Sequence, residues 1–168
     1  MANTYTLIAS NVLTTTTTNV VFNSLPTTYT DLLVKVSVRS LNAGADFLKL
    51  NVSPAIAYSN TLLLGNGATA SSTRNTGQGY LRVGYISNAN DTSDTFSNGE
   101  IYIPNYRSTV DKQLSSVGFS ENNGTTAYIA NYANLLQTND VITSLTFAAA
   151  SADMAAGSSF YLYGISKS

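Results

Sequence analysis

Apolar and polar side chains alternate with a period of two between residues 31 and 40, and no other pattern in the chain restricts the fold as strongly. Every second position there carries a branched apolar side chain: Leu32, Val34, Val36 and Val38. Successive side chains of a β-strand point to opposite faces of the sheet, so the alternation predicts a strand with one buried and one solvated face. Such half-buried strands are common in antiparallel sheets.

Ten further segments alternate in the same way or are dense in β-branched and aromatic residues, which also indicates strands. They span residues 5–8, 19–22, 46–52, 58–64, 79–86, 99–103, 113–119, 126–132, 141–147 and 160–165. Asn-Gly pairs at 66–67, 98–99 and 123–124 are typical of tight turns between strands. The best helical candidate, 148–157, is equally well interpreted as an Ala-rich loop.

About eleven short strands in 168 residues predict an all-β fold, which is a sandwich, a jelly roll or a barrel. We favour an antiparallel β-sandwich that is jelly-roll-like and has about ten to eleven strands, and a receptor-type β-sandwich is the alternative. The length fits a single β-sandwich domain over residues 1–168, which buries roughly 70% of the surface that its unfolded chain exposes.

The composition excludes most enzyme classes and several kinds of partner. Cys, His and Trp are absent, which removes thiol nucleophiles, imidazole and zinc–thiolate sites, disulfides and every triad with a histidine base. Only 10% of the residues are charged, whereas Thr, Ser and Asn together make up 61 of the 168. With 8 Lys and Arg against 9 Asp and Glu, we expect neither nucleic acid nor membrane as a partner.

Acidic residues are the remaining candidates for catalysis or metal binding. Asp91 and Asp94 are close enough in sequence to supply calcium ligands, but the spacing of an EF-hand loop is missing, so we expect a hydrogen-bonded loop. Glu100 and Glu121 could form the carboxylate pair of a glycosidase, yet each lies at the end of an expected strand, where a solvated carboxylate is the simpler interpretation. We therefore expect no catalytic residue, no metal ligand and no cofactor.

Tyrosine is the residue type best suited to recognition in this chain. Pairs of tyrosines at i, i+2 or i, i+4 are either stacking platforms for sugars or a partner chain, or half-buried rings whose hydroxyl reaches water. Tyr102 stands between two isoleucines, and if these face the core it points outward as an interface anchor. The interaction candidates are Tyr102, Tyr106, Arg107, Tyr128 and Tyr132.

Several short motifs occur in a fixed order along the chain. They are Tyr5-Thr-Leu-Ile8, Leu25-Pro-Thr-Thr-Tyr-Thr-Asp-Leu-Leu33, Gly99-Glu-Ile-Tyr-Ile-Pro-Asn-Tyr106, Glu121-Asn-Asn123 with Ala127-Tyr128, Ile142-Thr-Ser-Leu145 and Tyr161-Leu-Tyr-Gly-Ile165. Together they resemble a family of virion structural proteins from tailed bacteriophages of the cyanophage and aquatic-virus type. The resemblance covers residues 5 to 165. Each motif consists of residues that are common in strands, so no single motif is specific, and the specific signal is the order in which the motifs occur.

This resemblance implies a non-enzymatic virion component with an all-β, jelly-roll-like body, and it transfers no catalytic residue. Both capsid decoration proteins and tail-fibre tips of phages use small β domains. A decoration (cement) protein binds a repeated shell surface, commonly as a trimer, and stabilises the shell that it recognises. The first expected strand begins at Tyr5, so we expect no shaft before it, which favours decoration.

We therefore expect a capsid decoration protein, a homotrimer that binds the major capsid protein. Its location is then the capsid surface of the virion, after assembly in the host cytoplasm. The alternative is a tail-fibre or receptor-binding tail component that binds carbohydrate, which the tyrosines favour.

Overall fold

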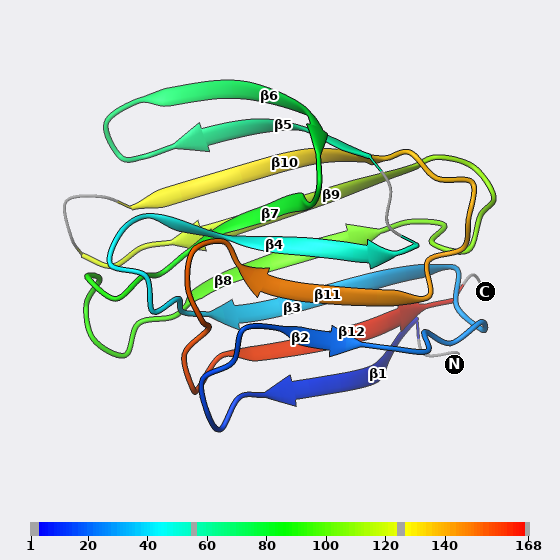
Figure 1. The fold of residues 1–168 in the computed structure, drawn as a ribbon, viewed down its shortest axis with the longest axis horizontal. Helices are drawn as coiled ribbons and strands as arrows, with labels where there is room; N and C mark the ends of the chain where they lie inside the picture. The colour runs from blue at the N-terminus through cyan, green and yellow to red at the C-terminus, as the bar shows by residue number, and fades with distance from the viewer. Residues whose placement is uncertain (1–3, 55–56, 124–126, 167–168) are drawn as a thin grey trace.

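The structure is a computed structural model that describes residues 4–54, 57–123 and 127–166. In these residues twelve β-strands form two antiparallel sheets (Figure 1). The strands are β1 (Tyr5–Val12), β2 (Val20–Phe22), β3 (Asp31–Val38), β4 (Asp46–Ser53), β5 (Tyr58–Gly65), β6 (Ala70–Gln78), β7 (Leu81–Ile86), β8 (Ser97–Ile103), β9 (Lys112–Ser120), β10 (Tyr128–Leu136), β11 (Ser144–Ala149) and β12 (Ser159–Ile165). The large sheet has the order β1-β12-β3-β8-β9-β10-β5-β6, and the small sheet has the order β2-β11-β4-β7.

The strand order is that of a jelly roll with two additional hairpins. Four antiparallel pairs are nested along the chain: β1 with β12, β2 with β11, β3 with β8, and β4 with β7. The first and third pairs belong to the large sheet and the other two to the small sheet, which is the double Greek key of a jelly roll. The additional hairpins, β5–β6 and β9–β10, both extend the large sheet beyond β8.

The predicted antiparallel, jelly-roll-like β-sandwich is confirmed, with twelve strands instead of ten to eleven. The strand that was not predicted is β6, whose nine residues have no apolar face and therefore no periodicity to detect. The segment 148–157 contains no helix. Its first two residues end β11, and the rest is a loop that Met154 anchors, because this fully buried side chain lies where the backbone bridges to Thr17 and Ser40.

The two sheets pack their apolar faces against each other and share one core. The side chains of the alternating segment on β3 all face this core, and none is more than 9% exposed: Leu32, Val34, Val36 and Val38. Phe147 of the small sheet contacts Phe160 of the large sheet, with ring centroids 5.4 Å apart, and Phe22 edge-on at 6.3 Å. Buried aromatic contacts of this kind add to the free energy gained from apolar burial alone.

Two glycines mark the place where β7 crosses β9. A Cβ atom on Gly118 would lie 2.7 Å from the Cα atom of Gly84, and a Cβ atom on Gly84 would lie 3.3 Å from the Cα atom of Gly118. Packed sheets usually stand about 10 Å apart, separated by their side chains. At this crossing the backbones themselves are in contact, so the edge of the small sheet lies directly on the large one.

The β5–β6 hairpin extends beyond the edge of the small sheet (Figure 1). Tyr85 of the edge strand β7 covers the inner face there, because it packs against a second cluster formed by Leu62, Ala130 and Tyr132. Tyr85 also stacks on Tyr128, with ring centroids 4.4 Å apart. Most residues of β6 are exposed, so this strand forms a polar edge of the large sheet.

We expect Gly118→Ala to lower the free energy of unfolding by about 1–3 kcal/mol, the usual penalty for overpacking, because the added methyl group must displace the backbone of Gly84. Gly65→Ala is the matched control, since a Cβ atom there meets nothing within 4 Å. Urea unfolding followed by far-UV circular dichroism measures both variants. Equal stability of the two would contradict a backbone contact between the sheets.

Candidate functional site

The outer face of the large sheet, meaning the face turned away from the small sheet, carries most of the exposed apolar surface. In the described part of the chain nine large apolar side chains are exposed, and strand alternation places six of them on this face. They are Tyr5, Leu7 and Val12 of β1, Leu63 of β5, Phe119 of β9 and Ile129 of β10. Exposed apolar residues that gather on one face indicate a binding surface.

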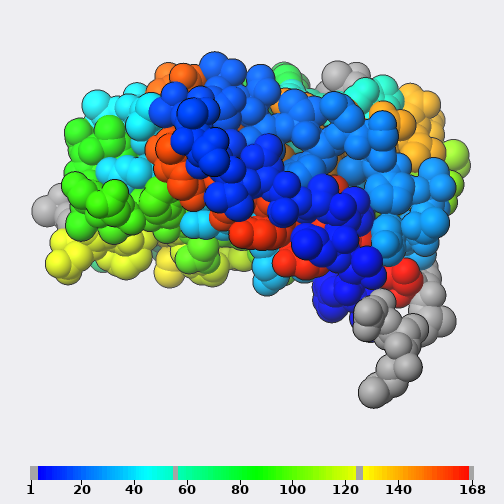
Figure 2. Space-filling model, turned by 90° about the horizontal axis from the view of Figure 1, so that it is seen from below, coloured from blue at the N-terminus to red at the C-terminus, as the bar shows by residue number. Residues whose placement is uncertain are grey.

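These side chains form two groups at opposite ends of the outer face. In the first group Leu7 is paired with Tyr163 across β1 and β12, which lie side by side on the surface (Figure 2). In the second group Phe119 is paired with Ile129 across β9 and β10. The other neighbour of Ile129 is Gly65, and because this residue has no side chain, Ile129 is 55% exposed.

The middle of the outer face is polar but contributes no net charge. Lys35 and Glu100 form an ion pair there, with 2.7 Å between Nζ and Oε2, and it is the one ion pair among the residues described. Its hydrogen bond raises the pKa of Lys35 above the usual value. Both side chains are about half exposed, so the pair adds little stability, and its two charges cancel each other.

A hollow of about 460 Å³ crosses the outer face beside this ion pair. It follows one row of paired residues over five strands: Tyr102, Ser115, Ala133, Thr61 and Arg74. The small side chains in the middle of the row create the space. Tyr102 limits it at one end, and its hydroxyl donates a 2.8 Å hydrogen bond to Asp31, which raises the pKa of the tyrosine.

Tyr106 and Tyr132 do not fit the interaction role predicted for them. Tyr106 is fully buried in the turn after β8, where its hydroxyl donates to the carbonyl oxygen of Pro26. Tyr132 is only 3% exposed, because β10 turns it inward beside Leu62. A side chain without exposed surface cannot contact a partner, so the prediction was wrong for both residues.

The other three interaction candidates lie at the surface: Tyr102, Arg107 and Tyr128. Both isoleucines beside Tyr102 are fully buried, so this ring points outward, as the alternation predicts. Arg107 is exposed, and its guanidinium donates to the carbonyl oxygen of Thr27, which joins the turn after β8 to the β2–β3 loop. Tyr128 lies beside a cavity at the end of the sandwich.

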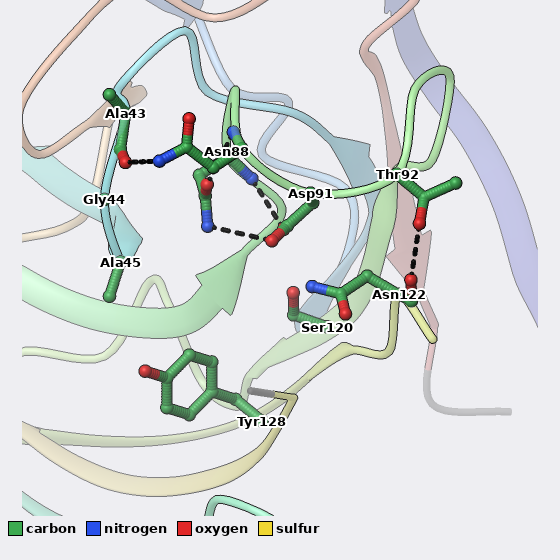
Figure 3. A pocket seen from close by; sticks show the side chains of 10 residues that line it. Ala43, Gly44, Ala45, Asn88, Asp91, Thr92, Ser120, Asn122 and Tyr128 are labelled. Carbon is green, nitrogen blue, oxygen red and sulfur yellow. Dashed lines mark hydrogen bonds between the residues drawn. The ribbon is translucent and has the colours of Figure 1, made fainter. Parts of the chain in front are cut away.

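This cavity, which we call the end pocket, has a volume of about 360 Å³ (Figure 3). It is bounded by 43–45 of the β3–β4 loop, by 88 and 90–92 of the β7–β8 loop, by Ser120 at the end of β9 and Asn122 after it, and by Tyr128 at the start of β10. Figure 3 shows the Tyr128 ring across the cavity from the β7–β8 loop. Burial raises the pKa of Tyr128.

Hydrogen bonds hold the wall of the end pocket together. Within the β7–β8 loop the Asp91 carboxylate accepts from the backbone N–H and the side-chain amide of Asn88, at 2.8 and 3.1 Å. Between loops, the amide of Asn90 donates to a carbonyl oxygen of the β3–β4 loop, and the Thr92 hydroxyl donates to the carbonyl oxygen of Asn122 at 2.6 Å. Each of the three loops is therefore bonded to at least one other (Figure 3).

Arg39, just after β3, organises the β7–β8 loop beside the end pocket. Its guanidinium donates to four backbone carbonyl oxygens at 2.9–3.5 Å, those of Ala89, Asp91, Thr92 and Thr95. The carbonyl groups of a loop lack the partners that a strand ladder supplies. One cation therefore satisfies several of them at once and fixes the path of the loop.

The acidic residues are dispersed in the structure. No group of three or more potential metal-ligating side chains occurs within the ranges that the structure describes. Glu100 is paired with Lys35, whereas Glu121 accepts N–H groups from the two residues that follow it. The strand partner of Glu100 is Val117, so Glu121 lies four residues, roughly 13 Å, farther along the sheet.

The apolar outer face was missed by the sequence interpretation, although one signal for it is present. Leu62, Leu63 and Leu64 follow one another in β5. Since neighbouring residues of a strand face opposite sides, an uninterrupted apolar run places at least one side chain away from any single core face. The exposed residue is Leu63, at 56%. The end pocket has no such local signal, because three separate loops build it.

The chain matches no protein-family model, and no curated protein or solved structure matches it either. In the described part of the chain no helix has the length and apolar character needed to cross a membrane. What the protein does is therefore inferred from its own surfaces.

We expect Arg39→Lys to loosen the β7–β8 loop without unfolding the sandwich, because an ammonium group cannot reach four carbonyl oxygens as the planar guanidinium does. A loss of about 2 kcal/mol in local stability speeds amide hydrogen exchange in 88–96 about 30-fold. Mass spectrometry of exchanged peptides measures the exchange rate, and peptides from β3 and β12 serve as the internal reference. The control variant is Arg74→Lys on the exposed strand β6. Unchanged exchange in the loop would show that Arg39 does not order it.

Three fully or partly buried tyrosines predict a loss of stability at alkaline pH. Burial raises the pKa of Tyr106, Tyr128 and Tyr132 above the usual value of 10.0. The folded protein thus retains these protons where the unfolded chain has released them, so the free energy of unfolding falls as the pH rises above about 10.

Tyr132→Phe isolates one of these groups. Its hydroxyl has no hydrogen-bond partner among the described residues, so we expect the variant to be as stable as the parent at pH 7, or up to about 1 kcal/mol more stable. Above pH 10 its stability falls less steeply than that of the parent. Urea unfolding between pH 7 and 11 measures both effects, with Tyr161→Phe on the outer face as the matched control. A variant that loses stability at pH 7 would overturn this assignment.

Proposed function

We propose that the protein is a non-enzymatic structural component of a tailed-phage virion, namely a capsid decoration protein that binds the major capsid protein and stabilises the shell. The observation that carries the proposal is the outer face of the large sheet, with six exposed apolar side chains and an ion pair that cancels its own charge. The jelly-roll topology agrees with the resemblance seen in the sequence, but folds of this kind serve many functions, so the surface is the stronger support.

The outer face has the properties that docking on a protein shell requires. Phe119 and Ile129 form an adjacent apolar pair, and a few such anchors supply most of the binding free energy of an interface. The neutral hydroxyl and amide groups around them carry a smaller desolvation penalty than charged groups would. Because the strands are hydrogen-bonded into one sheet, the surface is ordered before it meets its partner, which reduces the entropy lost on binding.

The second apolar group suits contacts between subunits of a homotrimer. Tyr5, Leu7 and Val12 lie on β1, which is an edge strand of the large sheet. Edge strands have unpaired backbone N–H and C=O groups, which add hydrogen-bonding capacity to the apolar side chains. We assign this group to the subunit contact and the Phe119–Ile129 group to the shell.

A tail-fibre or receptor-binding component is the alternative, and the polar lining of the end pocket favours it. Immunogold electron microscopy of the virion separates the two proposals. Label on the capsid surface supports decoration, and label confined to the tail overturns it.

We expect the purified protein to bind expanded capsids of the phage that encodes it and to raise the temperature at which these shells melt. The double variant Phe119→Ser, Ile129→Ser weakens binding about 30-fold, because it removes an anchor pair worth about 2 kcal/mol. Val110→Ser is the matched control, since this valine is 62% exposed but belongs to the β8–β9 loop.

Co-sedimentation measures the binding and scanning calorimetry measures the shell melting. Decoration is refuted if the protein leaves shell melting unchanged. The assignment of the contact to the outer face fails if the double variant binds as tightly as the Val110→Ser control.

A further inference from the structure

The end pocket has a shape and chemistry that docking through the outer face does not use. We propose that it binds one neutral sugar unit of a glycan. This inference does not rest on capsid decoration, because the pocket is built from loops at the end of the sandwich, whereas the proposed shell contact lies on the outer face.

The size of the cavity limits the occupant to a small molecule or the terminal unit of a longer one. Its volume of about 360 Å³ is near the lower end of small-ligand pockets, which measure about 300–1,000 Å³. A folded partner would not fit inside it.

The charge of the wall restricts the ligand further. Asp91 is the one acidic or basic residue among the described residues that line the cavity. An anionic ligand would meet this carboxylate with no cation among the described lining residues to offset the repulsion. Calcium binds several oxygen ligands, usually with more than one carboxylate, so a wall with a single carboxylate that already accepts two hydrogen bonds does not suit it. The charge therefore favours a neutral ligand.

The uncharged groups of the wall match the hydroxyls of a sugar. Asn90 has a second amide N–H and a side-chain oxygen, the Thr92 hydroxyl can still accept after donating its proton to Asn122, and Ser120 adds a second hydroxyl. Tyr128 adds an aromatic surface with a polar tip, on which the C–H groups of a sugar ring can pack. Tyr85 stacks on this ring at 4.4 Å and holds its orientation. A lipid chain would leave the polar groups unpaired, which disfavours an apolar ligand.

The wall is also ordered before a ligand arrives. Hydrogen bonds join the β7–β8 loop to the β3–β4 loop and to the segment after β9, and Arg39 binds the carbonyl oxygens of the same β7–β8 loop. Loops that are already fixed lose little entropy on binding. For a single sugar ring in one pocket we expect a dissociation constant of about 1 mM, and many copies on one particle would strengthen attachment through multivalency.

The test is a titration of the ¹⁵N-labelled full chain, followed by the amide signals in two-dimensional NMR spectra. The probes are the methyl glycosides of glucose, galactose, mannose and N-acetylglucosamine, with glucuronate and N-acetylneuraminic acid as anionic counterparts. We expect at least one neutral glycoside to shift the amides of Gly44, Asn88 and Asp91, and both anionic sugars to bind at least tenfold more weakly. No saturable shift with any neutral probe at about 50-fold its expected dissociation constant would overturn the proposal.

Two variants locate the binding. Ala45→Trp places a large side chain in the lining of the end pocket and is expected to abolish the shifts. Ala68→Trp, in the exposed β5–β6 turn, is the matched control and keeps them. If the shifts persist in Ala45→Trp, the sugar binds at another site, and the assignment to the end pocket is overturned. The Phe119→Ser, Ile129→Ser variant retains sugar binding, so failure of the pocket and failure of the docking face are separate results.

Discussion

The contact between the inner faces of two sheets of unequal size positions every surface of this protein. The small sheet covers the central strands of the large one, and its edge strand β7 lies so close to β9 that Gly84 and Gly118 meet backbone to backbone. The four strands of the small sheet cannot cover all eight strands of the large sheet, so the β5–β6 hairpin extends past the small sheet. Tyr85 covers the inner face of the large sheet there. The opposite face of the large sheet becomes a broad platform, and the connecting loops gather at the strand ends, where they enclose the end pocket.

Scarcity of charge shapes how the loops are held. Lys112 is only 2% exposed, yet its ammonium group donates to the carbonyl oxygens of Val110, Thr138 and Asp140, and burial lowers its pKa. Arg39 is used in the same way on the β7–β8 loop. Hydrogen bonds from a cation to backbone oxygens are stronger than neutral ones. Both cations therefore order loops and satisfy backbone groups, while the surface stays nearly neutral.

The parts of the structure that could be predicted are those in which one local pattern decides the outcome. The alternation on β3 and the outward direction of Tyr102 follow from the two-residue period of a strand, because a buried neighbour forces the next side chain to the opposite face. Tyr106 and Tyr132 could not be placed in this way: the first lies in a turn outside the regular strand, and the second faces a part of the core that only β7 creates. β6 was missed because neither of its faces is covered, so nothing in the fold demands apolar residues there.

The sequence by itself determined the class of fold and the neutral character of the surface, because strand periodicity, turn residues and composition act locally or on the chain as a whole. It also excluded chemistry based on Cys or His, which are absent. Only the tertiary structure decided which face of each strand the second sheet covers, which tyrosines are exposed, and that three loops from distant parts of the chain enclose one cavity. The reason is physical: a two-residue period distinguishes the two faces of a strand, but pairing order and sheet packing determine which of those faces is buried.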